Sequence, residues 1–208
     1  MVQYDLSHLT QQNNQDVIGP IQDDEALFIY SMIRGMRLKR ILEIGGLNGY
    51  SGTNFCKATE DIPNSQIYTI DINPVPIMGT NHKCIEKNAV LIEASDIDNE
   101  PLNLVFFDCH DYNVQMILYH RLKDMNMITD KTVLMLHDTN LHPYQRVPWS
   151  YPLEDGFVHQ TVERQMVNTF KLMGYDIFSI KTSANQHDEN LPFRHGVTVC
   201  QRFFPMFI

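Results

Sequence analysis

Two short segments of the chain place carboxylate and imidazole groups side by side, each directly after an apolar run. Asp108-Cys109-His110-Asp111 follows the run at 104–107, and His137-Asp138 follows the run at 133–136. Charged groups at the rim of a buried strand are costly unless they are paired or bind a metal ion. An imidazole with a pKa of about 6.5 can also accept a proton at neutral pH. These segments are therefore candidates for metal binding and proton transfer.

A glycine-containing turn follows another apolar run. The stretch 41–51 has the sequence Ile-Leu-Glu-Ile-Gly-Gly-Leu-Asn-Gly-Tyr-Ser. Glycines let backbone N–H groups approach a ligand closely, and the helix that follows offers unpaired N–H donors. Leu47 stands where the dinucleotide fingerprint Gly-x-Gly-x-x-Gly requires its second glycine. The pattern, Glu-x-Gly-x-x-x-Gly, instead resembles the first motif of class I S-adenosylmethionine (SAM) methyltransferases.

Further polar residues are expected at the ends of the next two strands. Asp71 lies about 20 residues beyond the glycine turn, where a carboxylate can accept hydrogen bonds from both ribose hydroxyls of a nucleoside. In proteins of the fold that this chain resembles, residues after the third strand face adenine, and Ser95 and Asp96 are expected there. The alternative for the acidic run 96–100 is a solvated loop. The expected cofactor-binding residues are Glu43, Gly45, Gly46, Gly49, Ser51, Asp71, Ser95, Asp96 and Asp108.

The elements that must position these residues alternate between strand and helix. Strands are expected at 40–45, 65–71, 89–94, 103–108, 132–137, 176–182 and 196–203, and helices at 20–38, 51–60, 114–126 and 158–173. The last two strands are joined by a polar loop without a helix, which fits a hairpin rather than a parallel crossover. This order predicts an α/β, Rossmann-like fold with a mostly parallel seven-stranded sheet, an antiparallel last strand and helices on both faces.

The helix at 20–38 is predicted from its charges and its apolar spacing. Acidic residues come early and basic residues late, as the helix dipole favours. Its apolar positions Leu27, Tyr30, Ile33 and Met36 recur at helical spacing. Residues 1–39 are expected to form an N-terminal extension with this helix, and residues 40–208 the SAM-dependent methyltransferase domain, in a single domain overall.

Composition narrows the classes of partner. The chain has 208 residues, with 43% hydrophobic and 20% charged residues and a net charge of -9. This charge argues against a nucleic-acid or membrane partner, because phosphate binding needs a basic surface. The four cysteines contain no Cys-x-x-Cys pair, so neither a zinc site nor a disulfide framework is expected. With no apolar leader at 1–15 and no run of membrane-spanning length, a cytoplasmic location is expected.

From about Arg40 to Arg202, the chain resembles one branch of the methyltransferase fold, the macrocin O-methyltransferase-like and cephalosporin hydroxylase-like group. The two acid–histidine segments carry this part of the resemblance. It implies a SAM-dependent O-methyltransferase that transfers a methyl group to a hydroxyl of a sugar or other small metabolite. The implied cofactors are SAM and, with the metal-assisted form of the reaction, Mg²⁺ or Mn²⁺.

The resemblance also assigns roles at the two acid–histidine segments. Members of this group hold Mg²⁺ with an acid after the fourth strand and an acidic pair after the fifth, which correspond here to Asp108, His137 and Asp138. His137 replaces the first acid of the pair, and imidazole suits a transition metal better than Mg²⁺. The identity and presence of the metal therefore stay open, with Asn140 as a substitute oxygen ligand. His110 stands at the position of the general base, and Asp111 is the alternative base.

Two polar loops and two alternative functions complete the sequence-based hypotheses. The segment 141–157, rich in aromatic residues, is expected to contact the acceptor, and 183–194 to form a second wall of the site or a dimer contact. The N-terminal helix and the apolar tail 203–208 are candidate surfaces for a homo-oligomer.

One alternative function is that of a non-catalytic protein of this fold that binds SAM or acts as a partner subunit. A less favoured alternative is a nicotinamide-dependent oxidoreductase.

Overall fold

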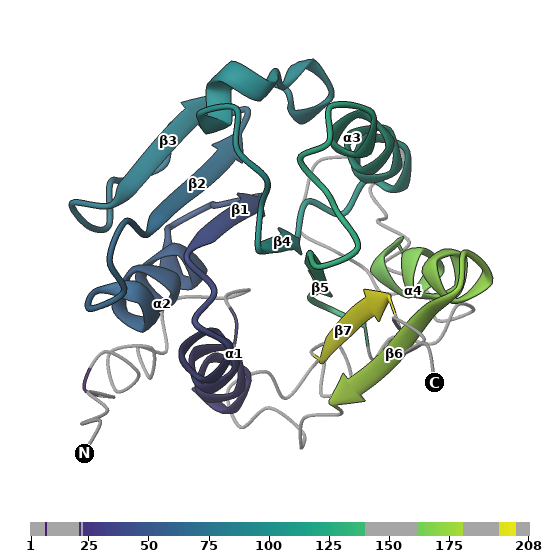
Figure 1. Ribbon diagram of the computed structural model, residues 1–208, viewed down its shortest axis with the longest axis horizontal. Coiled ribbons are helices and arrows are strands. Elements are labelled where there is room, and N and C mark those ends of the chain that lie inside the picture. Colours follow the sequence, from purple (N-terminus) through teal and green to yellow (C-terminus); the bar gives the residue numbers. More distant parts are fainter. Residues whose placement is uncertain (1–6, 8–20, 22, 140–161, 181–195, 203–208) are drawn as a thin grey trace, which may run out of the picture.

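The computed structural model describes residues 7, 21, 23–139, 162–180 and 196–202. These residues form one seven-stranded sheet with the order β3-β2-β1-β4-β5-β7-β6 (Figure 1). The strands are β1 (Arg40–Ile44), β2 (Gln66–Asp71), β3 (His82–Glu86), β4 (Leu104–Phe107), β5 (Val133–Leu136), β6 (Tyr175–Ile180) and β7 (Val197–Arg202). Pairing is parallel from β3 through β5, and β7 runs antiparallel to both β5 and β6. The predicted fold class is confirmed.

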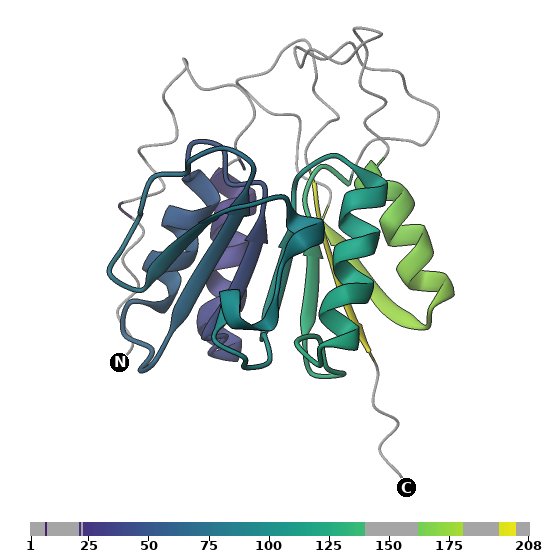
Figure 2. The same ribbon diagram turned by 90° about the horizontal axis from the view of Figure 1, so that it is seen from above.

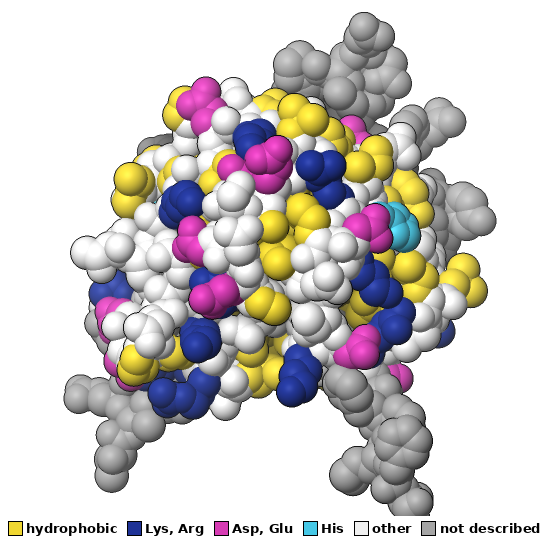
Figure 3. All heavy atoms as spheres, turned by 45° about the horizontal axis from the view of Figure 1, so that its top comes forward, with side chains coloured by type: hydrophobic (Ala, Val, Ile, Leu, Met, Phe, Trp, Pro, Cys, Tyr) yellow, Lys and Arg dark blue, Asp and Glu magenta, His cyan; other side chains and the backbone are white. Residues whose placement is uncertain are grey.

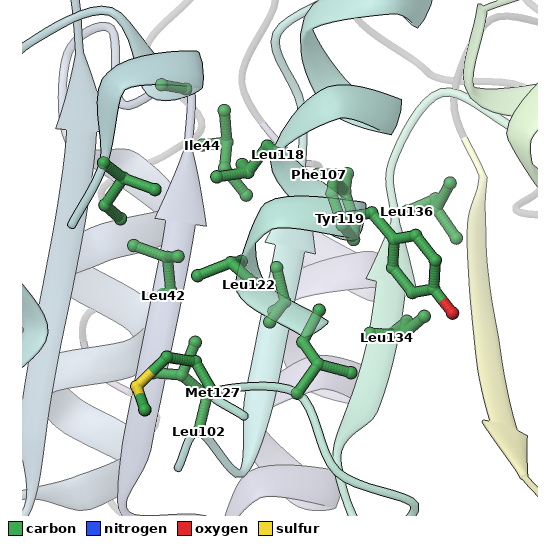
Figure 4. Close-up of a cluster of buried hydrophobic side chains, with 14 of the residues drawn as sticks. Leu42, Ile44, Leu102, Phe107, Leu118, Tyr119, Leu122, Met127, Leu134 and Leu136 are labelled. Carbon is green, nitrogen blue, oxygen red and sulfur yellow. The ribbon is translucent and has the colours of Figure 1, made fainter. Parts of the chain in front are cut away.

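Helices cover both faces of this sheet. They are α1 (Asp23–Met36), α2 (Tyr50–Thr59), α3 (Tyr112–Asp124) and α4 (Val162–Leu172). The first two pack on one face and the last two lie side by side on the other (Figures 1 and 2). Strand side chains alternate between the faces, so Ile41 joins the cluster under α1 and α2, whereas Leu42 joins the cluster under α3 and α4. Figure 4 shows Leu118 and Leu122 of α3 lying among strand residues of that second cluster.

The prediction of the third strand at 89–94 is wrong. The third strand is β3, and 89–94 instead begins with the 3-10 turn η2 (Ala89–Leu91), in which the Asn88 side chain accepts a hydrogen bond from the Val90 N–H. Among the described strands, the edge strand β3 pairs with β2 alone, and its sequence His-Lys-Cys-Ile-Glu has little apolar content. An edge strand needs no continuous apolar run, which is why the sequence pattern missed it.

The predicted apolar face of α1 is only half right. Tyr30 and Ile33 are buried, but Leu27 and Met36 are 42% and 47% exposed. Each residue advances an α-helix by about 100°, so apolar positions spaced strictly by three drift away from one stripe. The buried stripe is completed instead by Ala26 and Ile29. The Asn54 side chain of α2 donates to the Ala26 carbonyl oxygen at 3.0 Å, which fixes α1 beside α2.

One face of the molecule and the lengths of its helices bear on the partners expected from the sequence. Figure 3 shows a face on which basic, acidic and apolar side chains are intermixed rather than gathered into one continuous basic region. Among the described helices, none is long and apolar enough to cross a membrane.

Candidate active site

The residues expected to carry chemistry meet at the carboxyl edge of the central strands. Hydrogen bonds continue one step beyond the strands: Gly45 N–H donates to Ile70 O at 3.1 Å, and Asp108 N–H donates to Ile44 O at 3.0 Å. His137 N–H donates in the same way to a β4 carbonyl at 3.2 Å. Ligands of open parallel sheets bind at this edge.

The glycine turn packs directly against the end of β4. Gly45 has φ +89°, and a Cβ placed there would lie 2.3 Å from the Asp108 carbonyl oxygen. Gly49, which precedes α2, has φ +77°, and a Cβ there would lie 2.1 Å from Met78 Cε. Both positions therefore favour glycine for conformation, and Gly45, which faces backbone atoms, also requires it for space.

The Asp71 side chain accepts hydrogen bonds from the backbone of the glycine turn. Its Oδ2 accepts hydrogen bonds from the N–H groups of Gly46 at 2.9 Å and Leu47 at 3.3 Å. Its Oδ1 accepts one from the Asn73 N–H at 2.9 Å. The carboxylate thus lies beside the turn, as the sequence predicts for a nucleoside contact, and it also fixes the shape of the turn.

Glu43 and Ser51, two predicted cofactor contacts, are buried beneath the turn. The Glu43 carboxylate accepts hydrogen bonds from the Ser51 hydroxyl and from Thr69 Oγ1, the latter at 2.6 Å. His82 Nδ1 accepts from the Met78 N–H, which leaves Nε2 to donate to Thr69 Oγ1 at 2.8 Å. Burial raises the pKa of Glu43 to about 7. These contacts tie β1, β2 and α2 together behind the turn.

Ser95 and Asp96, the predicted adenine contacts, lie in the 3-10 turn η3 (Ala94–Ile97) rather than directly after a strand. Asp96 accepts a hydrogen bond from the Glu93 N–H at 2.8 Å and pairs with Lys87 at 2.7 Å. Ser95 is exposed. Asp96 therefore stabilises the turn, and the contact with adenine stays a prediction.

The two acid–histidine segments do come together. His137 Nδ1 lies 3.3 Å from Asp108 Oδ1 and 3.5 Å from Asp138 Oδ1. Each of these residues offers one ligand atom within 4.8 Å of the other two. His110 and Asp138 both have left-handed backbone conformations, with φ +55° and +52°. Such conformations in residues other than glycine are uncommon and cluster at functional sites.

His110 lies near the same two aspartates, Asp108 and Asp138, as His137. Its Nε2 is 3.7 Å from Asp108 Oδ1 and 3.8 Å from Asp138 Oδ2, and its side chain is 16% exposed. Its Nδ1 lies 3.3 Å from Glu163 Oε1, which also accepts hydrogen bonds from the His110 backbone N–H and from Gln115 Nε2. Asp111, the alternative base, is exposed and caps α3 by accepting from the Val114 N–H at 3.0 Å.

Two buried carboxylates of the cluster, Glu25 and Glu163, were not predicted. Glu25 Oε2 lies 3.1 Å from His137 Nε2, and Glu163 contacts His110 as described. A signal was present in the sequence. Glu25 shares the helical stripe of the buried Ile29, and Glu163 shares that of the buried Val167. An acid on an apolar helix stripe has to be buried with a partner.

The carboxylates govern the charge of both histidines. Although burial lowers it, the pKa of His110 is raised to about 9 by Glu163, Asp108 and Asp138. Burial also opposes the charge on His137, but the neighbouring carboxylates raise its pKa well above the usual value. Burial raises the pKa of Asp108. In this arrangement His110 carries a proton at pH 7, which differs from the neutral imidazole expected of a general base.

The donor set fits a divalent cation. Ligands about 2.1 Å from a metal ion lie about 3.0 to 3.4 Å from one another in octahedral or tetrahedral geometry, close to the 3.3 and 3.5 Å observed here. The cluster contains four carboxylates and two imidazoles. When all four acids are ionised, its net charge is negative even if both imidazole rings are protonated. Asp108, Asp138 and His137 are the residues that would hold the ion. Asn140 and the segments 141–157, 183–194 and 203–208 lie outside the described residues.

Comparison with known proteins shows the fold of the chain. No family model and no curated protein matches the sequence. The methyltransferase PaMTH1 from Podospora anserina, bound to S-adenosylhomocysteine (SAH), matches with a TM-score of 0.63 at 17% identity, over 96% of this chain and 88% of that one. The O-methyltransferase TomG from Streptomyces achromogenes, involved in tomaymycin synthesis and bound to SAM, gives 0.60 at 17%, over 98% and 92%. An SAH complex of an O-methyltransferase from Bacillus cereus gives 0.61 at 12%, over 97% and 93%.

The sheet order, the antiparallel β7 and these matches define the Rossmann-like methyltransferase fold. At these identities the likeness concerns the fold. The particular macrocin-like branch has no counterpart among the matches described.

Proposed function

We propose that the protein is a SAM-dependent O-methyltransferase that acts on a hydroxyl group of a sugar or other small metabolite. The observation that carries this proposal is the meeting of two features at one strand edge. The glycine turn held by Asp71 lies there beside the buried acid–imidazole cluster around Asp108. The SAM and SAH complexes among the similar structures support the choice of cofactor.

In the proposed reaction the chain mainly aligns three atoms. The turn and Asp71 would bind the cofactor so that the acceptor oxygen, the methyl carbon and the sulfonium sulfur lie in line. A divalent cation, when bound, would supply Lewis acidity that lowers the pKa of the acceptor hydroxyl. His110 Nε2 is the proposed acceptor of the hydroxyl proton, because it lies at the partly exposed side of the cluster. Its carboxylate neighbours hold a proton on it, so His110 must lose that proton before it acts as a base.

The acid–histidine segments support the macrocin-like branch and therefore a sugar-like acceptor. A second candidate function, a SAM-binding protein without transferase activity, is favoured by one observation. His137 stands in place of an acid that the branch uses for Mg²⁺. The two candidates differ in turnover and not in SAM binding.

Calorimetric titration of the protein with SAM and SAH, with and without Mg²⁺ or Mn²⁺, tests the proposal. We expect saturable binding of both compounds and none of NADH, which serves as the control for a nicotinamide enzyme. With binding established, a screen of sugars and small hydroxylated metabolites should give SAH as a product. Absence of SAM binding under all conditions would overturn the proposal. Binding without turnover on any acceptor would favour the second candidate.

His110→Ala separates binding from chemistry within the same proposal. It removes the proposed base and leaves the glycine turn and Asp71 in place. We expect turnover to fall at least tenfold while the dissociation constant of SAM changes little. Unchanged turnover would exclude His110 as the base.

A further inference from the structure

We propose that Glu25 of α1 is a positioning residue that orients His137 as a nitrogen ligand, and that the site therefore prefers a late first-row ion such as Co²⁺, Ni²⁺ or Zn²⁺ over Mg²⁺. This inference rests on the cation site of the proposed function. It concerns metal binding, which can be measured without methyl transfer.

The contact between Glu25 and His137 is fully enclosed. Both side chains are 0% exposed, and Glu25 Oε2 lies 3.1 Å from His137 Nε2. The other carboxylate oxygen, Oε1, accepts a hydrogen bond from the Gly196 N–H at 2.6 Å. One oxygen is thus fixed by the backbone beside β7, and the second faces the imidazole. The contact with Gly196 therefore fixes the orientation of the carboxylate relative to the ring.

This contact decides which ring nitrogen faces the other acids. With Nε2–H donating to Glu25, the nitrogen directed at Asp108 and Asp138 is Nδ1, at 3.3 and 3.5 Å. The Phe106 ring lies roughly parallel to the imidazole, at 26° and 6.3 Å between centroids. A metal-bound histidine nearly always donates its other N–H to a carboxylate or carbonyl in this way, which raises the basicity of the ligating nitrogen.

The consequence is a preference among metal ions. Mg²⁺ favours six oxygen ligands and keeps much of its water, whereas imidazole is a strong ligand for later first-row ions. A ring that Glu25 holds with Nδ1 toward two carboxylates favours the second group. If Glu25 served only to anchor α1, its removal would weaken the fold without changing which metal binds.

The test is a titration of the metal-free full-length protein with Co²⁺, followed by its visible absorption bands, and with Mg²⁺ by competition. In Glu25→Gln, we expect Co²⁺ affinity to fall 10- to 100-fold, as for other losses of such partners, with Mg²⁺ affinity changed less than about threefold. His137→Asp should shift the preference toward Mg²⁺. In that background Glu25→Gln should have no further effect on Co²⁺. Asp24→Asn, which removes an exposed charge from the same helix, is the matched control and should bind Co²⁺ as the unmodified protein does.

Several results would overturn the inference. They are Co²⁺ binding unaffected by Glu25→Gln, equal weakening of Co²⁺ and Mg²⁺ in a folded Glu25→Gln protein, and absence of Co²⁺ binding by the unmodified protein. If Glu25→Gln does not fold, Glu25→Asp keeps the charge but withdraws the carboxylate, and the same selective loss of Co²⁺ is expected. SAM titration of the same samples separates the outcomes, because loss of SAM binding would refute the proposed function and leave the metal result standing.

Discussion

The glycine-turn region and the acid–imidazole cluster lie at the same sheet edge but are built differently. Around the turn, the carboxylates of Asp71 and Glu43 are held by neutral donors, namely backbone N–H groups and hydroxyls. In the cluster, carboxylates face imidazoles in contacts of 3.1 to 3.8 Å. The turn depends mainly on backbone shape, and the cluster depends on balanced charge.

The two regions also differ in how far apart their parts lie along the chain. The turn itself is one continuous segment followed by its own helix, and the partners Asp71 and Thr69 that hold its region lie only 24 to 26 positions away. The cluster joins Glu25 to His137 across 112 positions, and His110 to Glu163 across 53. This difference makes the turn a local device and the cluster a product of tertiary packing. Substitutions can test the contrast.

The largest effect is expected at Gly45, where the two regions touch. Gly45→Ala places a methyl group against the Asp108 carbonyl oxygen and forces φ +89° on a residue with a side chain. We expect the free energy of unfolding to fall by about 4 kcal/mol in urea denaturation. Gly174→Ala is the matched control, because φ is +83° there but no atom of the described residues lies within 4 Å of the added carbon. It should lose only about 1 kcal/mol, and equal losses would show that contact with β4 is unimportant.

The next effect tests the cluster itself. Glu163→Ala removes the acceptor of three donors, two on His110 and one on Gln115. Loss of one partner from a buried ionic contact costs about 3 kcal/mol, which urea denaturation should detect. Glu163→Gln keeps a carbonyl acceptor at the same place and should lose less. If the two variants were equally unstable, the hydrogen bonds to Oε1 would not be the reason.

The contrast between the glycine turn, formed by residues close in sequence, and the cluster, formed by residues far apart, explains how much the sequence could predict. The turn, the strands around it and the two acid–histidine segments were found because each is encoded locally, by an apolar run followed by glycine or charge. The edge strand β3 was missed because a strand with one partner needs few apolar residues. Glu25 is one of the early acidic residues of the predicted helix at 20–38, and its contact with His137 was missed because the two lie 112 positions apart.

The protonation of the histidines in the site could not be predicted from the sequence either. His110 was expected to be neutral from its ordinary pKa, and three carboxylates from separate elements reverse that expectation. Such a reversal depends on distances between side chains that no local pattern contains. The identity of the acceptor is undetermined for a related reason, because acceptor pockets are shaped by variable loops.

A pH-dependent effect is expected in the turn region. Burial raises the pKa of Glu43 from 4.5 to about 7, so the folded protein binds this proton more tightly than the unfolded chain. Between the two pKa values, rising pH removes the proton from the unfolded state first and stability falls. From pH 5 to pH 8, the unmodified protein should lose about 2 kcal/mol relative to Glu43→Gln. Parallel stability curves for the two proteins over this range would contradict the prediction.

The smallest effect separates two roles of Asp71. Asp71→Asn keeps an acceptor for the N–H groups of Gly46 and Leu47, so stability should change by less than about 0.5 kcal/mol. Asp71→Ala removes the acceptor and should cost about 1 kcal/mol. If the carboxylate also binds ribose hydroxyls, calorimetry should show about tenfold weaker SAM binding in Asp71→Asn. If Asp71→Asn binds SAM normally and Asp71→Ala does not, then Asp71 acts by shaping the turn and its charge is not needed for the cofactor.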